Sequence, residues 1–245
     1  MTDARGKPPG VTIERLVSKY PRLYHMAEAN SWDCIRKFGL LSTSRLLDLC
    51  ETPARERERI EEYRRPNSVP LESRVCGLIV IRDQKPLSES KLGGCLRGCN
   101  TRTWLRTLNG RVFFWLTLDR LKTFMSARAY RNKIHTVLTV ETESLVRSHI
   151  QQITLSPMNS GSTSPFAHPR ALDTFKSLED YPFAKRLHRG DNYCVVELAV
   201  DGGVPDIVKY TLRATHTSCI KSQLRTSKIL YEADTRWAVA RTTKP

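Results

Sequence analysis

The sequence lacks any run of 18 apolar residues, so we expect no helix that crosses a membrane and no membrane partner. Its first ten residues, MTDARGKPPG, lack the apolar segment of a secretory signal, and we expect a cytoplasmic protein. Acidic residues are scarce, because 25 Asp and Glu stand against 40 Lys and Arg, a formal net charge of +15. This excess favours an anionic partner, with nucleic acid as the first candidate, although some basic proteins simply have a high pI.

Several sequence signatures are also absent. There is no G-x-G-x-x-G, G-x-x-x-x-G-K-[ST], H-E-x-x-H or G-x-S-x-G. The sequence therefore lacks the motifs typical of Rossmann dinucleotide binding, P-loop phosphate binding, zincin proteases and α/β-hydrolases. The seven cysteines are odd in number and widely spaced, which predicts reduced thiols. Cys34, Cys76 and Cys194 lie among apolar neighbours and are predicted to be small core residues. Cys95 and Cys99 have no second pair of ligands nearby, so we predict no metal site.

The positive charge is concentrated in two windows. Residues 97–133 hold nine Lys and Arg and one acid, and residues 208–245 hold eight and two, so the windows carry +8 and +6. Local basic stretches fit a surface that follows nucleic-acid phosphates, and a solvated basic face without a ligand is the alternative. The candidates for nucleic-acid contacts are Arg106, Arg111, Arg131 and Lys133.

Residues 51–65 differ from both windows, because they hold five acids and five bases. They predict a solvated helix with internal ion pairs, inside a charged helical excursion at residues 51–70.

The apolar pattern predicts one domain over residues 1–245, with an α+β fold. The expected strands include residues 23–26, 75–82, 112–117, 136–140, 153–155 and 194–200. The expected helices include 31–39, with Ser31 and Gly39 at its caps, 44–50, 119–130 and 141–150. Residues 156–168 are predicted to be a loop, residues 207–213 a strand or short helix, and residues 224–231 show a mixed pattern.

Three short features stand out for chemistry. Tyr24-His25 lies on an expected strand and precedes a helix that ends in Gly39-Leu40-Leu41-Ser42. Val112-Phe113-Phe114-Trp115 is an aromatic strand, and Glu197 stands inside the apolar run CVVELAV. A carboxylate in a core strand is costly unless it is paired or faces a cleft. The plainer interpretations are a structural histidine, a core aromatic strand, and an edge strand that exposes Glu197 to solvent.

Taken in order, these features resemble the ADP-ribosyltransferase fold, and most closely the DarT-like enzymes that modify nucleic-acid bases. The matching blocks are Leu23-Tyr24-His25, the stretch from Ser31 to Leu41, the aromatic strand, and Glu197 followed by Val204-Pro205. They lie within residues 20–210, and the flank of the aromatic strand departs from the DarT pattern. The resemblance implies a split antiparallel β-sheet core with peripheral helices.

The resemblance also implies an activity, namely transfer of ADP-ribose from NAD to a DNA or RNA base with release of nicotinamide. It implies a toxin or defence enzyme, with an antitoxin or immunity partner. Glu197 would be catalytic together with an arginine, for which Arg82 is the first choice and Arg128 the second. The residues expected to bind NAD are Tyr24, His25, Met26, Leu41, Ser42, Phe114, Trp115 and Asn159.

Three alternatives stay open at this point. The same fold could act on a protein, with the positive charge incidental. It could also be a catalytically inactive module that binds nucleic acid. RNA 2′-phosphotransferases share the fold and the Tyr-His strand, but they do not use a late glutamate, so Glu197 argues against them.

Overall fold

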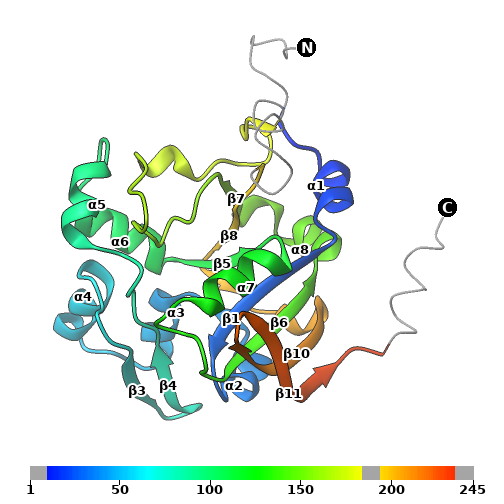
Figure 1. Ribbon diagram of the computed structural model, residues 1–245. Helices are drawn as coiled ribbons and strands as arrows, with labels where there is room; N and C mark the ends of the chain where they lie inside the picture. Colours follow the sequence, from blue (N-terminus) through cyan, green and yellow to red (C-terminus); the bar gives the residue numbers. More distant parts are fainter. Residues whose placement is uncertain (1–9, 184–193, 235–245) are drawn as a thin grey trace.

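The computed structural model describes residues 10–183 and 194–234, and Figure 1 shows how its helices surround one large sheet. The helices are α1 Ile13–Lys19, α2 Trp32–Phe38, α3 Thr43–Leu49, α4 Ala54–Glu62, α5 Glu89–Cys95, α6 Thr101–Asn109, α7 Leu118–Ser126 and α8 Thr142–His149. The strands are β1 Arg22–Glu28, β2 Leu40–Leu41, β3 Val69–Ser73, β4 Gly77–Ile81, β5 Arg111–Trp115, β6 His135–Glu141, β7 Ile153–Ser156, β8 Glu197–Asp201, β9 Gly203–Val204, β10 Thr211–Ile220 and β11 Gln223–Glu232. This mixture of helices and antiparallel strands confirms the predicted α+β class. Within the described ranges, no helix is long and apolar enough to span a bilayer.

The main sheet has seven strands in the order β11-β10-β6-β1-β5-β8-β7, and every neighbouring pair is antiparallel. The pairing between β1 and β5 is narrow, because it joins only Tyr24 to Trp115. By comparison, β1 pairs with β6 over seven residues and β5 with β8 over five. The sheet therefore consists of two parts that meet at one residue pair and separate toward Glu28 and Arg111. Two short ribbons, β2–β9 and β3–β4, complete the pairing.

Strand alternation gives the main sheet two apolar faces. Leu23, Phe114 and Leu198 point to one face and join the largest core cluster, together with side chains from α1, α2 and α8. Met26 and Val137 point to the other face and pack against Leu121 and Met125 of α7. Figure 1 shows α7 lying across β1 and β5. Both faces of the central strands are thus covered, which is why β8 reads as an almost continuous apolar run.

The charged excursion contains helix α4 and is followed by the β3–β4 hairpin. The helix is shorter than predicted, but it carries the expected internal ion pairs, Arg57–Glu61 at 3.2 Å and Arg59–Glu56 at 3.7 Å. The hairpin and α4 share an apolar cluster with α3. A disulfide between Cys34 and Cys76 ties α2 to the turn before β4. The prediction of reduced thiols at these two cysteines is therefore wrong.

Several boundaries differ from the sequence prediction. Strand β4 begins at Gly77 rather than residue 75, and α7 ends at Ser126 rather than Tyr130. The hairpin formed by β10 and β11 was not predicted, because its turn uses Lys221 and Ser222 at positive φ instead of the usual Gly or Asn.

Gly39 does end α2 as predicted. Its φ is +90°, and a Cβ atom there would lie 2.4 Å from the Cα of Pro205.

Candidate active site

Glu197 begins β8, which lies between β5 and β7 in the main sheet. Its register partners are Trp115 on β5 and Ser156 on β7, and Trp115 is itself opposite Tyr24 on β1. Directly opposed residues of antiparallel strands point to the same face, so Tyr24, Trp115, Glu197 and Ser156 form one row across the sheet. Glu197 is only 3% exposed. The interpretation of Glu197 as a solvent-facing residue on an edge strand is therefore wrong.

The Glu197 carboxylate is held by the loop that follows β7. Its Oε2 accepts hydrogen bonds from the backbone N–H of Ser160 at 2.9 Å and from the Ser160 hydroxyl at 2.6 Å. The Ser160 carbonyl in turn accepts a bond of 3.0 Å from Nη1 of Arg170, which is 3% exposed. The neutral residue Ser160 thus fixes one oxygen of the carboxylate. The cation Arg170 bonds to Ser160 and not to the carboxylate itself.

The electrostatic environment of Glu197 favours proton uptake near neutral pH. Burial raises its pKa to about 7, although the Ser160 hydrogen bonds and the charges of Arg120 and Arg170 act in the opposite direction. Removal from water destabilises the charged carboxylate more than these partners stabilise it. A carboxyl group of this kind can both give and take a proton at pH 7.

An aromatic chain connects Trp115 to Arg82. The ring centroids of Trp115 and Phe124 are 5.3 Å apart, and those of Phe124 and Tyr130 are 4.8 Å apart. The guanidinium of Arg82 lies 4.9 Å from the Tyr130 ring centroid, and its Nε donates to Glu28 at 3.1 Å. Arg82 is therefore the predicted arginine that joins the cluster on the Trp115 face.

His25 lies on β1, on the opposite face from Trp115 and at the place where β1 and β5 separate. Its Nδ1 is 2.8 Å from the Phe113 carbonyl, and Arg82 Nη1 donates to the Met26 carbonyl at 3.1 Å. These two side chains therefore bond to strand carbonyls on the two sides of the split. Burial lowers the pKa of His25 to about 4, so the ring is neutral at pH 7. Because a carbonyl only accepts, we assign the proton to Nδ1, which leaves Nε2 as an acceptor.

The other residues predicted to bind NAD are less closely grouped. Met26 is buried beneath α7, and Phe114 is fully buried on the His25 face, with ring centroids 5.7 Å apart. Asn159 directly precedes Ser160 in the loop over Glu197. Leu41 and Ser42 lie at the β2–β9 ribbon beyond the far end of β8, about 13 Å along the strand from Glu197 at the usual rise per residue. The structure does not bring these two residues to Glu197.

The predicted nucleic-acid contacts divide into two groups. Arg106 forms an ion pair with Glu62, while Arg111 pairs with Asp201 at 2.6 Å and stacks on Phe175. Arg131 and Lys133, like Arg128, are exposed in the segment after α7.

That exposed segment lies beside the β10–β11 hairpin, since the N–H of Asn132 donates to the Cys219 carbonyl at 3.1 Å. We call the six exposed cations of the two segments the basic edge; they are Arg128, Arg131, Lys133, Lys221, Arg225 and Lys228. Neither residues 120–140 nor residues 207–231 contain an acid. The basic edge thus brings together parts of both basic windows.

Sequence reasoning missed Arg170, Arg120 and Tyr130. Phe124 and Tyr130 belong to the predicted helix 119–130, so its apolar face was a usable signal for the aromatic chain. Arg170 follows a Ser/Gly/Pro-rich loop, and nothing in that pattern marks it as a buried cation.

Comparison with known proteins gives a family but no function. No curated protein matches the chain. A model of a family of unknown function, DUF7002, matches residues 21–211, a segment that contains Tyr24, His25, Trp115 and Glu197 and ends at the start of β10. Because this match covers well over half of the sequence, the chain belongs to the DUF7002 family.

Proposed function

We propose that the protein is an NAD-dependent mono-ADP-ribosyltransferase that modifies a base of DNA or RNA and releases nicotinamide. One observation carries this proposal. The strands with Tyr24-His25, Trp115 and Glu197 are far apart in the sequence but adjacent in the sheet, and the sheet splits beside His25. Glu197, a buried glutamate with a pKa of about 7, lies between Trp115 and Ser156 in the row across the sheet. This arrangement supports the activity that the sequence resemblance implies.

Glu197 would act on the ribose of NAD. Breaking the bond between ribose and nicotinamide builds positive charge on the sugar, and an ionised carboxylate stabilises that charge. A base nitrogen of the target forms the new bond to the ribose, and its proton passes to Glu197. Ser160 orients the carboxylate for this step, while the charges of Arg170 and Arg120 favour its ionised form.

The remaining groups suit NAD by their chemistry. At the split between β1 and β5, Nε2 of His25 offers an acceptor for a ribose hydroxyl. On the other face of the sheet, Trp115 offers an aromatic surface for the nicotinamide ring. The guanidinium of Arg82 suits a pyrophosphate, although in the free protein it is bound to Glu28. Since Glu197 is 3% exposed beneath the Asn159-Ser160 segment, this segment has to shift before a substrate reaches the carboxylate.

The basic edge supports a nucleic-acid target. None of its six cations forms an ion pair with another described residue, so their charge is available to phosphates. Tyr130 connects this edge to Arg82, because it lies between Arg128 and Arg131 in sequence and stacks on the Arg82 guanidinium. A target base would be unpaired or flipped, since a duplex hides the base atoms that react.

Labelled NAD tests the proposal directly. The purified protein is incubated with NAD carrying an isotope in its adenine, together with a cell lysate that has or has not been treated with nuclease. We expect acid-precipitable label that nuclease removes and protease does not. Label that only protease removes would instead show a protein target.

A second candidate is a module that binds nucleic acid without catalysis, and the burial of Glu197 beneath its loop favours it. Salt-sensitive nucleic-acid binding without release of nicotinamide would establish this candidate and overturn the transferase proposal.

A further inference from the structure

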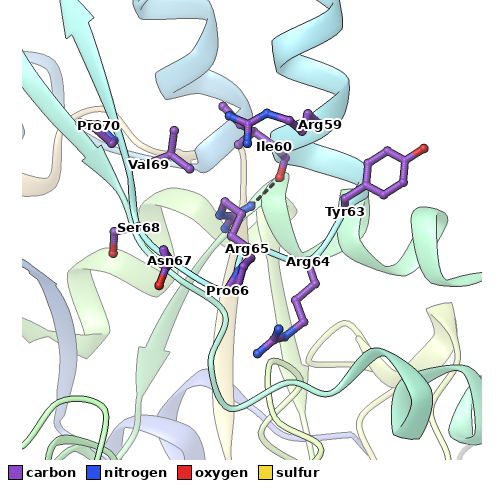
Figure 2. A pocket seen from close by; sticks show the side chains of 10 residues that line it. All are labelled: Arg59, Ile60, Tyr63, Arg64, Arg65, Pro66, Asn67, Ser68, Val69 and Pro70. Carbon is purple, nitrogen blue, oxygen red and sulfur yellow. Dashed lines mark hydrogen bonds between the residues drawn. The ribbon is translucent and has the colours of Figure 1, made fainter.

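A pocket of about 340 Å³ lies between the end of α4 and the start of β3, away from Glu197 (Figure 2). Three arginines line it, namely Arg59, Arg64 and Arg65, and none of its ten lining residues is acidic. Ile60, Val69 and Pro70 supply apolar walls. A volume of this size is within the range of small-molecule sites.

Arg65 is a buried cation whose side-chain hydrogen bonds all go to neutral groups. It is 7% exposed, and it donates to the Ile60 carbonyl at 2.6 Å, the Arg82 carbonyl at 3.0 Å and Oδ1 of Asn109 at 3.0 Å. All three acceptors are neutral, and no carboxylate of the described residues pairs with Arg65. Burial lowers its pKa to about 10, although the charge of Asp83 acts in the opposite direction.

The bond to Ile60 has a structural role as well, because it caps a carbonyl at the end of α4. This capping role explains why an arginine is present at position 65, but it does not explain Arg59 or Arg64. Figure 2 shows Arg59 extending toward the same space beside Val69, whereas Arg64 turns away along the rim. Arg59 has only a partly exposed Glu56 at 3.7 Å, and the bonding partner of Arg64 is the neutral Leu87 carbonyl. Among the described residues, the three arginines therefore have one ion pair, the loose contact of Arg59 with Glu56, and Asp83 acts on Arg65 through its charge without pairing with it.

We propose that this pocket binds a small phosphate-bearing anion. Guanidinium groups bind phosphate oxygens through paired, charge-assisted hydrogen bonds, and Arg59 and Arg65 approach the pocket from different elements. The apolar walls would receive the uncharged part of a phosphate ester. Because Arg65 also holds the Arg82 carbonyl, the bound anion would stabilise the strand end that carries Arg82. The proposal does not depend on ADP-ribosyl transfer.

Pyrophosphate is the probe for the test, and its binding to the full chain is measured by isothermal titration calorimetry at constant ionic strength. Arg59→Ala removes an exposed side chain, so the fold is expected to persist. Arg55→Ala is the matched control, because Arg55 is an exposed arginine of the same helix that does not line the pocket. We expect saturable binding that Arg59→Ala weakens by roughly tenfold and Arg55→Ala leaves unchanged, in line with the loss of one charge-assisted contact.

Two further variants keep the test decisive. Arg64→Ala is expected to weaken binding by a smaller factor than Arg59→Ala, and the pair Arg131→Ala with Lys133→Ala on the basic edge is expected to have no effect. The proposal is overturned if the native protein shows no saturable binding, if Arg55→Ala and Arg59→Ala behave alike, or if only the basic-edge pair reduces binding. Circular dichroism confirms that each variant is folded.

Discussion

Two buried glutamates, Glu62 and Glu197, have opposite kinds of partner. Glu62 is 6% exposed and pairs with two arginines of α6, Arg102 at 3.8 Å and Arg106 in closer contact. Glu197 is 3% exposed, and none of the described residues forms an ion pair with it; its bonds come from Ser160.

The difference shows how one residue type serves two purposes. A buried carboxylate with cations in direct contact ties two elements together, here α4 and α6. A buried carboxylate held by a hydroxyl and an amide keeps a pKa near 7 and stays available for proton transfer. The ion pairs of Glu62 also explain why Arg102 and Arg106 of α6 are unsuited to bind nucleic acid, since both already pair with this carboxylate.

The largest expected effect is on turnover. Glu197→Gln keeps the shape and the Ser160 contacts but removes the charge, so we expect nicotinamide release to fall by about 10³-fold with little change in the KM for NAD. Glu62→Gln is the matched control and should leave turnover within about threefold, because it lies outside the candidate site. Steady-state kinetics measures both. Equal losses in the two variants would remove the distinction between the two glutamates.

The second prediction concerns stability against pH. The pKa of Glu197 is about 7 in the folded protein, against an ordinary value of 4.5 for an exposed glutamate, so the folded protein holds this proton more tightly than the unfolded chain. Stability is therefore lost as pH rises from 4.5 to 7. That loss amounts to about 3 kcal/mol at 1.36 kcal/mol per pH unit. His25 acts oppositely, because its pKa falls from 6.5 to about 4 and stability is lost as pH falls through that range.

The two pH effects oppose each other in the native protein, so single variants reveal them. Urea unfolding at pH 4.5 and pH 7.5 should show that Glu197→Gln gains stability relative to the native protein as pH rises. His25→Asn should gain it as pH falls. Parallel pH profiles for all three proteins would show that neither group is perturbed.

The third prediction concerns the paired cations. Removing both Arg102 and Arg106 by alanine substitution leaves Glu62 buried without a counter-charge, and we expect a loss of about 2 kcal/mol in the free energy of unfolding. Lys221→Ala with Arg225→Ala removes the same charge from the basic edge and should change stability by less than about 0.5 kcal/mol. Similar losses of unfolding free energy in the two double variants would show that the ion pairs of Glu62 do not stabilise the fold.

The smallest effect is expected for binding at the basic edge. Substituting Arg131, Lys133 and Arg225 by alanine should weaken oligonucleotide binding roughly tenfold at moderate salt. The slope of the logarithm of the binding constant against the logarithm of the salt concentration should fall by about 3 in magnitude. The matched triple variant removes the exposed cations Arg55, Arg74 and Lys91 instead. Fluorescence anisotropy over a salt series separates them, and equal slopes would mean that net charge alone drives binding.

Local patterns were enough to predict the central elements. A short apolar run predicted β1, β-branched and aromatic runs predicted β5, β6 and β8, and Ser31 and Gly39 bounded α2. The burial of Glu197 was not predicted, because its apolar neighbours left open whether the carboxylate faces a cleft or solvent, and its place on a strand between β5 and β7 is seen only in the structure.

Pairings over long sequence separations were not predictable in the same way. Glu62 lies 44 residues from Arg106, and Cys34 lies 42 residues from Cys76. No local pattern indicates which cation will pair with an acid far away in the sequence. From the sequence, Arg106 and Arg111, which form ion pairs, were therefore treated in the same way as the exposed Arg131. The split between β1 and β5 was expected only from the resemblance.

Measuring the mass of separate target pools tests the central claim most directly. The purified protein is incubated with NAD and with DNA, RNA or protein, and each pool is then examined by mass spectrometry beside a Glu197→Gln control. We predict that DNA or RNA gains one ADP-ribose unit, and that the variant leaves it unmodified. Unmodified DNA and RNA in the presence of the native protein, or modification that persists in Glu197→Gln, would contradict the proposed function.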